Sequence, residues 1–586
     1  MRRRGATAAG NDACDDGDDS GDDSGGGGGG GGGGSSTFDG LLLPLLVAVR
    51  VFSALRNTIT DCDETFNYWE PTHYLLHNHG FQTWEYAPRF ALRSFPYLLP
   101  HALAAQVVAF FLPAGLGDLA SAKVTAFYGV RLMLGGACAC AEVAFCRAAA
   151  VRFGPNVGRL ALALSATSAG MFAASTAFLP ASFAMYAVMA VWAAWLAGRH
   201  ERAVALGVFA VCLGNWPFVG ALFVPLMLDT FVKHGLLKPV GWGLKYLALA
   251  LVPSVAVDAW FYRRVLSSAW NLFAYNVLGG GGGGGAELYG TEPADFYLKN
   301  AALNLNLTAA LALGPAALYV VVRLLGALCG GGGGASRREA LALLAFLSPL
   351  YGWFGLMCSR DHKEERFLFP VYPLFALAAA IALDKLQALA AAALRSPRAA
   401  RGLALAALAA AAALSASRVA AVVTGYGAPL TIYQHVSRLA LTPPPAPASM
   451  RRLCVGQEWY RFPASFFVAS APVRLQVSFL KSGFGGQLPA EFLPDVGTHS
   501  EGGPFNDENA EEPSRYVELN SCDYVVDWNL GGRWDGVAGW EVLARAPFLD
   551  AAKSHALLRA FYVPFGVSAK RTAFEDYLLL KNTQRA

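Results

Sequence analysis

Long apolar runs separated by shorter polar stretches fill the first 425 residues of the chain. Because about 20 mostly apolar helical residues are needed to cross a membrane, these runs predict membrane-spanning helices. They lie near residues 41–56, 96–113, 121–146, 159–179, 181–198, 203–214, 216–232, 243–262, 299–328, 339–358, 367–394 and 401–423. The pattern predicts ten to twelve spans, with eleven or twelve favoured, since the runs on either side of Trp216 and Pro217 form one kinked helix or two.

The composition agrees with a polytopic α-helical membrane protein. Hydrophobic residues make up 55% of the 586 positions and charged residues only 15%, against about 25% charged in soluble proteins. The formal net charge of +4 is small for this length, and no basic stripe carries interleaved aromatic residues. The chain therefore does not read as a nucleic-acid-binding protein.

Three polar stretches are longer than helix connections need to be, namely 57–95, 263–298 and the tail after Thr424, and such loops are usually functional or disordered. Glycine tracts, the first at Gly25–Gly34, cannot bury apolar surface. We therefore predict a disordered extension over 1–37, a membrane domain over 38–425 that includes a charged loop at 359–367, and a C-terminal domain over 426–586. In the C-terminal domain, alternating residues such as Val473–Phe479 predict strands and a compact α+β fold.

The side of the membrane on which each loop lies is harder to predict. Arg2 to Arg4 favour a cytosolic N-terminus and place the 57–95 loop across the membrane. Arg147, Arg152 and Arg159 also favour the cytosol, yet two spans after that loop would return the chain to the far side. Either one of the early runs does not span, or the charge bias fails here.

The first long loop concentrates acidic and aromatic residues in the segment TDCDETFNYWEPTHYLL, residues 60–76. Sugars are commonly bound by aromatic faces and by carboxylates that accept hydrogen bonds from hydroxyls, and a carboxylate can also remove a hydroxyl proton. The segment therefore indicates a sugar site, or alternatively an acidic solvated loop at a membrane face. Its candidate residues are Asp61, Asp63, Glu64, Tyr68, Trp69, Glu70 and His73.

A second charged segment, HKEERF at residues 362–367, lies between two strong apolar runs and follows Arg360 and Asp361. Its cations could hold a phosphate, and in a helix His362 and Arg366 would share one face. The alternative is a charged connector between two membrane helices. A third segment, LYGTEP at residues 288–293, predicts a turn whose Glu292 faces a substrate or caps the next helix.

The ten cysteines show no metal-ligand spacing, and we predict no metal site. Cys454 and Cys522 lie in the polar C-terminal part of the chain. They could pair if this part faces an oxidising lumen, and two free thiols are the alternative.

These segments together resemble glycosyltransferase family 22, multi-span enzymes that use dolichyl-phosphate mannose. HKEERF is similar to the family's signature, and the Asp63-Glu64 pair followed by Phe66 is similar to its mark in the first loop. Within the family the resemblance is to the α-1,2-mannosyltransferases of dolichol-linked N-glycan precursor assembly. It extends from about residue 40 to residue 580 and includes the segments DCDETFNYWEPTHYL, FQTWEY, FLPASFAMY, LYGTEP, HKEERFLFPVYPL, EWYRFP, EEPSRY and LLRAFYVPF.

The resemblance implies a GT-C fold with a C-terminal α+β lumenal domain, in the endoplasmic reticulum membrane, and an active site facing the lumen. It implies inverting transfer of mannose to a 2-hydroxyl on a dolichyl-diphosphate-linked oligosaccharide, on the six- and eight-mannose intermediates, without a metal or other cofactor. Asp63 is then the expected base, with Glu64 orienting or sharing that role. His362, Lys363 and Arg366 would hold the donor phosphate, and Glu365 would position them. The candidate acceptor contacts are Asp61, Tyr68, Trp69, Glu70, His73, Tyr289 and Glu292.

Other function classes remain open on composition alone. A transporter could have as many spans, but transporters place ionisable residues inside membrane helices and often show inverted repeats, whereas here the charge clusters lie in loops. A scaffold or receptor has no need of a carboxylate cluster and a phosphate-type cluster. Among enzymes, the rivals are the α-1,6-mannosyltransferase of the same pathway and the glycosylphosphatidylinositol mannosyltransferases.

Overall fold

The computed structural model describes residues 33–111, 119–278, 286–329, 334–439, 450–468, 475–494 and 497–585. The chain divides into two units, 1–41 and 42–586, and every strand and the candidate site belong to the second. Of the predicted disordered extension, residues 1–32 lie outside the described residues, whereas 33–37 belong to helix α1 (Gly33–Arg56). The glycine tracts at 279–285 and 330–333 also lie outside the described residues.

Helices dominate the first 440 residues. After α1 they are α2 (Glu70–His77), α3 (Phe95–Phe111), α4 (Leu119–Phe153), α5 (Pro155–Thr167), α6 (Ala169–Ala174), α7 (Pro180–Leu196), α8 (His200–Leu213), α9 (Val224–His234), α10 (Leu237–Tyr262), α11 (Ser268–Val277), α12 (Phe296–Asn304), α13 (Leu307–Leu311), α14 (Ala317–Cys329), α15 (Gly334–Cys358), α16 (Tyr372–Ala393), α17 (Pro397–Tyr426) and α18 (Ala428–Leu439). Within the described residues, six helical segments are each long and apolar enough to cross a membrane: Ala122–Phe153, Leu237–Tyr262, Leu307–Cys329, Ser336–Cys358, Glu365–Ala393 and Pro397–Tyr426.

Several predicted spans fold as shorter or broken helices, which is why fewer than ten satisfy the length criterion individually. The run at 159–179 divides at Ser168, whose side chain caps the N-terminus of α6. The run at 216–232 begins as a 3-10 segment, Pro217–Phe223, before α9 starts. Apolar length alone therefore does not give the number of continuous helices.

Helix α3 begins and ends next to the first loop. Near its end, Val108 packs so closely on Gly129 of α4 that an added Cβ would meet its Cγ2 at 2.5 Å. Two residues earlier in α4, Phe127 contacts Trp69 of the first loop, with ring centroids 4.2 Å apart. This arrangement favours the first of the two alternatives, in which one of the early runs does not span.

The first loop is largely folded. Residues Glu64–Trp69 form a π-helix that continues into α2, and α2 ends at Asn78, which adopts a left-handed conformation with φ of 54°. Strand β1 (Phe81–Gln82) then pairs antiparallel with β4 (Ala490–Glu491) of the C-terminal domain. The first loop and the C-terminal domain are therefore joined by backbone hydrogen bonds.

The C-terminal domain is built on a five-stranded sheet of order β3-β2-β5-β7-β6. Its strands are β2 (Arg451–Val455), β3 (Leu475–Phe479), β5 (Tyr524–Trp528), β6 (Trp540–Asp550) and β7 (Ala573–Asn582), and a short helix, α19 (Ala556–Ala560), lies between the last two. β2 runs parallel to β3 and β5, whereas β7 runs antiparallel to β5 and β6. The predicted strand near 473–479 is confirmed at 475–479, and residues 473 and 474 lie outside the described part of the chain.

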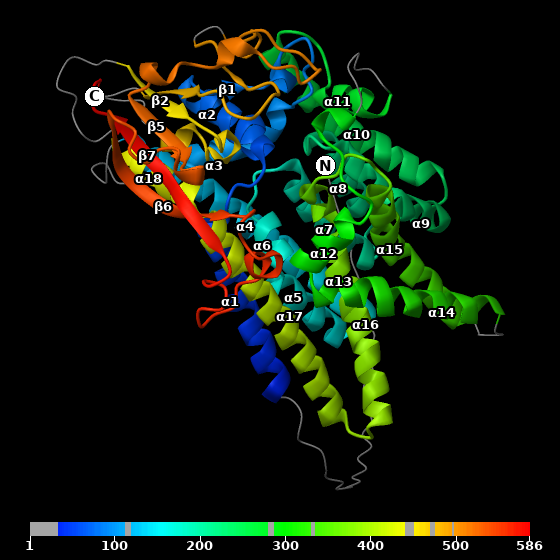
Figure 1. Ribbon diagram of the computed structural model, residues 1–586. Helices are drawn as coiled ribbons and strands as arrows, with labels where there is room; N and C mark the ends of the chain where they lie inside the picture. The colour runs from blue at the N-terminus through cyan, green and yellow to red at the C-terminus, as the bar shows by residue number, and fades with distance from the viewer. Residues whose placement is uncertain are drawn as a thin grey trace, which may run out of the picture. The chain divides into compact units, whose positions relative to one another are not determined.

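The two faces of the sheet bury different clusters. Leu453, Val477 and Val526 belong to the main core, which continues into the helices, while Val525 on the opposite face joins a smaller cluster with Leu578. Cys454 and Cys522 form a disulfide within the smaller cluster, which answers the question that the sequence left open. The sheet lies beside α2 and α3, and α16 and α17 extend away from it (Figure 1).

Candidate active site

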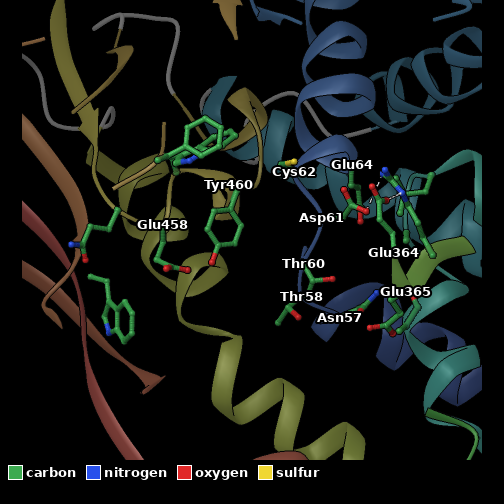
Figure 2. A pocket seen from close by; sticks show the side chains of 18 of the residues that line it. Asn57, Thr58, Thr60, Asp61, Cys62, Glu64, Glu364, Glu365, Glu458 and Tyr460 are labelled. Atoms are coloured by element: carbon green, nitrogen blue, oxygen red, sulfur yellow. Dashed lines mark hydrogen bonds and ion pairs between the residues drawn. The ribbon is translucent and has the colours of Figure 1, made fainter. Parts of the chain in front are cut away.

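A cavity of about 790 Å³ lies where the first loop, the HKEERF segment and the C-terminal domain meet. On one side Glu458 and Tyr460 project from the C-terminal domain, and on the other lie Asp61, Glu64 and Glu364 (Figure 2). The cavity is lined by Asn57, Thr58, Thr60, Asp61, Cys62, Glu64, Ala173, Ala177, Leu179, Glu364, Glu365, Arg366, Phe369, Gln457, Glu458, Trp459, Tyr460, Ser482, Gly483, Phe484, Trp528 and Leu530.

Arg366 links the two charged segments that the sequence analysis singled out. Its Nη1 lies 2.9 Å from Asp61 Oδ2 and its Nη2 lies 2.8 Å from Asp63 Oδ2, while its Nε is paired with Glu364. A planar guanidinium has N–H groups on all three nitrogens and can serve three carboxylates at once. The acidic and basic segments, about 300 positions apart, therefore form one charge network.

Arg93, which the sequence analysis missed, adds a second cation. Its Nη2 lies 3.4 Å from Asp63 Oδ2 and 2.7 Å from Glu85 Oε1, and its Nη1 donates a hydrogen bond to Tyr68 Oη at 2.6 Å. Asp63 is thus held between two guanidinium groups, while about a quarter of its side chain, 24%, remains exposed. In the sequence, the FQTWEY segment, which contains Glu85, was the feature that could have pointed to this part of the site.

The carboxyl groups of the first loop differ in their pKa. Burial raises the pKa of Asp63, but the charges of Arg366 and Arg93 outweigh burial and leave this pKa below its ordinary value. For Asp61, burial outweighs the charge of Arg366, and Glu364 and Asp63 add repulsion, so its pKa is raised to about 7. Burial likewise raises the pKa of Glu64. Near neutral pH, Asp63 is therefore the carboxylate of the three that is most firmly ionised.

Glu64 lies at the cavity wall but is held by the protein. Its Oε1 accepts hydrogen bonds from Trp69 Nε1 at 3.2 Å and from the Phe178 backbone N–H at 3.1 Å. These donors fix the carboxyl group of Glu64, the residue that follows Asp63 in the sequence. A fixed carboxyl group agrees with the orienting role expected for Glu64.

His362 and Lys363 contact the LYGTEP turn. His362 Nδ1 lies 2.9 Å from the Gly290 carbonyl and its Nε2 lies 2.9 Å from Glu364 Oε1, and Lys363 Nζ donates to the Glu292 carbonyl at 2.7 Å. The hydrogen bond to Glu364 is the main reason that the pKa of His362 is raised, although burial opposes it. The LYGTEP turn thus holds His362 and Lys363 of the HKEERF segment in place through its backbone carbonyls.

The HKEERF segment is not a regular helix. The 3-10 helix begins only at Glu365 and ends at Val371, so the condition under which His362 and Arg366 would share a helical face is not met. Glu365 accepts a hydrogen bond from Asn304 Nδ2 at 2.8 Å and is directed toward α12. Glu364, rather than Glu365, contacts both His362 and Arg366.

Several predicted acceptor contacts lie in the core and do not line the cavity. Tyr68, Trp69, Glu70 and His73 are each at most 1% exposed. Glu70 accepts hydrogen bonds from the Ser465 N–H at 2.6 Å, the Ser465 hydroxyl at 2.9 Å and the Phe81 N–H at 3.0 Å. Trp69, Glu70 and His73 hold the first loop against the C-terminal domain, whereas Tyr68 packs on Tyr97 of α3 and on Phe178.

The remaining acceptor candidates divide between two places. Asp61 lines the cavity, whereas Tyr289 and Glu292 lie on the side of His362, with the rings of Tyr289 and His362 6.3 Å apart. The C-terminal wall of the cavity, formed by residues 457–460 with Trp528, was not among the predicted site residues. The EWYRFP segment, which includes Glu458 to Arg461, was the signal for this wall.

Asp61, Cys62 and Asp63 offer possible metal-ligand atoms within 4.8 Å of one another. Arg366 pairs with both carboxylates of this group. A guanidinium therefore lies beside the carboxylates of this group and supplies positive charge there.

Comparison with known proteins agrees with this geometry. The sequence profile of the Alg9-like mannosyltransferase family matches residues 41–469. The chain is 37% identical over 559 residues to the α-1,2-mannosyltransferase ALG9 of Mus musculus and to that of Homo sapiens, with 92% of this chain and 87% of each relative covered. It is 35% identical over 551 residues to ALG9 of Arabidopsis thaliana, covering 92% of this chain and 91% of that protein.

The fold is also similar to that of a solved membrane glycosyltransferase. ArnT from Cupriavidus metallidurans bound to undecaprenyl phosphate matches with a TM-score of 0.52, covering 87% of this chain and 97% of that chain. The sequence identity is 12%, so the likeness concerns the fold alone. The prediction of a polytopic GT-C fold is confirmed.

Proposed function

The chain belongs to the Alg9-like mannosyltransferase family, and we propose that it transfers mannose from dolichyl phosphate β-mannose to the 2-hydroxyl of a mannose on a dolichyl-diphosphate-linked oligosaccharide. Its relatives are named α-1,2-mannosyltransferases, which agrees with the linkage. The acceptors that we propose are the six- and eight-mannose intermediates of N-glycan assembly.

The observation that carries this mechanism is the Arg366 bridge between Asp61 and Asp63. In the proposed reaction, Asp63 removes the proton from the acceptor hydroxyl as its oxygen bonds to the anomeric carbon. The bond from that carbon to the phosphate oxygen breaks, and its electron pair leaves with dolichyl phosphate. Attack opposite the leaving group converts the β-linked donor into an α-linked product.

We propose that His362 and Lys363 lie near the departing phosphate. Within the part of the chain that the structure describes, Lys363 Nζ donates one hydrogen bond, to the Glu292 carbonyl, and an ammonium group can donate three. Positive charge aimed at a leaving group lowers the barrier by stabilising the charge that develops there. The proposed reaction requires no metal or other cofactor.

We propose that the active site faces the lumen of the endoplasmic reticulum. Helix α7 begins beside Leu179 at the cavity and spans 17 residues, about 25 Å at 1.5 Å per residue, so the α7–α8 turn lies at the opposite end. Cations at the ends of helices distant from the cavity favour a cytosolic location for these ends; they include Arg152, Arg199, Arg202, Lys233, Arg395 and Arg398. The Cys454–Cys522 disulfide supports an oxidising compartment for the C-terminal domain.

Orientation can be tested on sealed microsomes. In a Leu557→Cys variant, whose position in α19 of the C-terminal domain is 66% exposed, an impermeant maleimide should label the introduced thiol only once the membrane is permeabilised. The wild type, treated in parallel, identifies any labelling of native cysteines. Labelling of the introduced thiol in intact microsomes would contradict a lumenal site.

A transfer assay tests the reaction itself. The purified protein in detergent would be given dolichyl-phosphate mannose with defined lipid-linked acceptors of six and eight mannoses, and the product would be digested with an α-1,2-specific mannosidase. We expect a digestible mannose on both acceptors, lost in Asp63→Asn. A product resistant to this enzyme, or transfer to neither acceptor, would refute the proposal and favour another family member's reaction.

A further inference from the structure

The cavity has an acidic lining that is unsuited to a phosphate. Among the described lining residues, the basic and acidic side chains are one cation, Arg366, and the carboxyl groups of Asp61, Glu64, Glu364, Glu365 and Glu458. Arg366 is already paired with three carboxylates. A phosphate here would face like charge, whereas a neutral sugar can donate hydroxyl hydrogen bonds to the carboxylates.

The wall opposite Arg366 is aromatic. It carries the half-buried rings of Trp459, Tyr460 and Trp528, and Trp459 packs against Phe484 with centroids 4.9 Å apart. Glu458 is held by Arg461 Nε at 2.7 Å, so it contributes little free charge. Trp and Tyr combine an apolar face with a polar edge, which suits the alternating C–H and O–H surface of a sugar ring.

Two polar atoms on this wall have no partner among the described residues. Gln457 Oε1 and Trp528 Nε1 are both shielded from solvent without a hydrogen bond. Such atoms are uncommon, because an unmet buried donor or acceptor costs free energy. One is an acceptor and the other a donor, and a sugar hydroxyl can serve either.

We propose that Gln457, Trp459, Tyr460 and Trp528 form a subsite for a non-reacting mannose of the acceptor, which directs the reacting 2-hydroxyl toward the Arg366 end of the cavity. This inference rests on the proposed function. A cavity of about 790 Å³ is within the range of about 300–1,000 Å³ found for small-ligand sites. It is therefore large enough for more than the reacting sugar.

The distance between the subsite and the carboxylates is fixed by the fold. Phe66 contacts Trp459 with centroids 5.5 Å apart, and Glu70 binds Ser465 beyond the EWYRFP segment. A mannose held at this wall therefore orients the rest of the acceptor relative to Asp61 and Asp63. Binding energy from such a remote sugar contributes to reaching the reactive geometry.

The test compares a full acceptor with a minimal one. Trp528→Phe keeps an aromatic ring and removes the Nε1 donor, and Gln457→Ala removes the acceptor. Initial rates would be measured with the six-mannose lipid-linked acceptor and with a single mannose on a short lipid. Trp540→Phe is the matched control, because Trp540 lies in β6 and packs on Trp534, with centroids 5.7 Å apart, outside the cavity lining.

We expect each subsite variant to raise KM for the six-mannose acceptor about threefold to tenfold, the range for one hydrogen bond. KM for dolichyl-phosphate mannose and for the minimal acceptor should stay within about twofold, as should every constant of Trp540→Phe. An unchanged KM for the six-mannose acceptor, or equal losses with both acceptors, would overturn the subsite.

A binding measurement separates this inference from the proposed function. Titration calorimetry of the wild type with the free six-mannose oligosaccharide, without donor, should give affinity that Trp528→Phe weakens. If the wild type transfers no mannose, the proposed function fails, and the calorimetry still decides the subsite. Equal binding of the oligosaccharide by the wild type and both variants would overturn the subsite even if transfer occurs.

Discussion

The Asp61–Asp63 pair allows the base to be identified from the acid side of the pH profile. A general base must be ionised to accept a proton. Two guanidinium groups lower the pKa of Asp63, whereas burial raises that of Asp61 to about 7. The same Arg366 serves both carboxylates, but they differ in charge state, and of the two only Asp61 is among the lining residues of the cavity.

The expected size of the pH effect follows from the lowered pKa of Asp63 and the pKa of about 7 of Asp61. If Asp63 is the base, its ionised fraction is complete from pH 8 to pH 6, and kcat/KM should not fall on its account. If Asp61 were the base, about half would be ionised at pH 7 and about 9% at pH 6, so kcat/KM would fall about fivefold. His362 has a raised pKa and loses its proton as pH rises. Its titration therefore affects kcat/KM on the alkaline side of the pH profile.

The assay is kcat/KM for the six-mannose acceptor from pH 6 to pH 8 in wild type, Asp63→Asn and Asp61→Asn. We expect Asp63→Asn to lose about 10²–10⁴-fold, the usual contribution of a general base. Asp61→Asn keeps an oxygen facing Arg366 and should retain activity within about fivefold. Thermal unfolding of both variants would show that they remain folded.

One result would refute this reasoning. A fivefold fall in wild-type kcat/KM between pH 7 and pH 6, together with near-complete loss of activity in Asp61→Asn, would assign the base to Asp61. The mechanism would then have Arg366 and Arg93 holding Asp63 as a permanently charged partner.

Three further predictions concern the same site. Arg366→Lys keeps one charge but cannot serve three carboxylates, so kcat should fall by about 10²-fold or more. Activity of this variant within tenfold of wild type in the transfer assay would contradict a role of the Arg366 bridge in the reaction. Glu70→Ala leaves the N–H groups of Ser465 and Phe81 unpaired, so thermal denaturation should show a loss of about 1–3 kcal/mol in the free energy of unfolding. The control, Asp295→Ala at an exposed ion pair, should change this free energy by no more than about 0.5 kcal/mol. Transfer should survive exhaustive chelation with EDTA, and a loss restored by added Mn²⁺ or Mg²⁺ would show that a metal is required.

The sequence by itself determined the membrane helices and the two charged segments. Both are local features, since apolar length predicts a helix in lipid and neighbouring residues such as His362 and Lys363 are visible as a cluster wherever they fold. The strand at 475–479 was equally visible from its alternation. Hydropathy could not show that α3 begins and ends next to the first loop, because this depends on the packing of Val108 against Gly129.

Only the tertiary structure decided how the segments meet and which side chains face the cavity. The first loop is rich in aromatic residues, and the sequence could not separate those that bind a ligand from those that pack. Trp69 and His73 are buried because α4 and the C-terminal domain cover them, and Tyr68 is buried against Tyr97 of α3 and Phe178. The residues that cover these side chains lie as far as about 400 positions away along the chain. Contacts between residues so far apart form only when the whole chain folds. Arg366 likewise forms its bridge because the fold brings Asp61 and Asp63 to it, so that buried charges are paired.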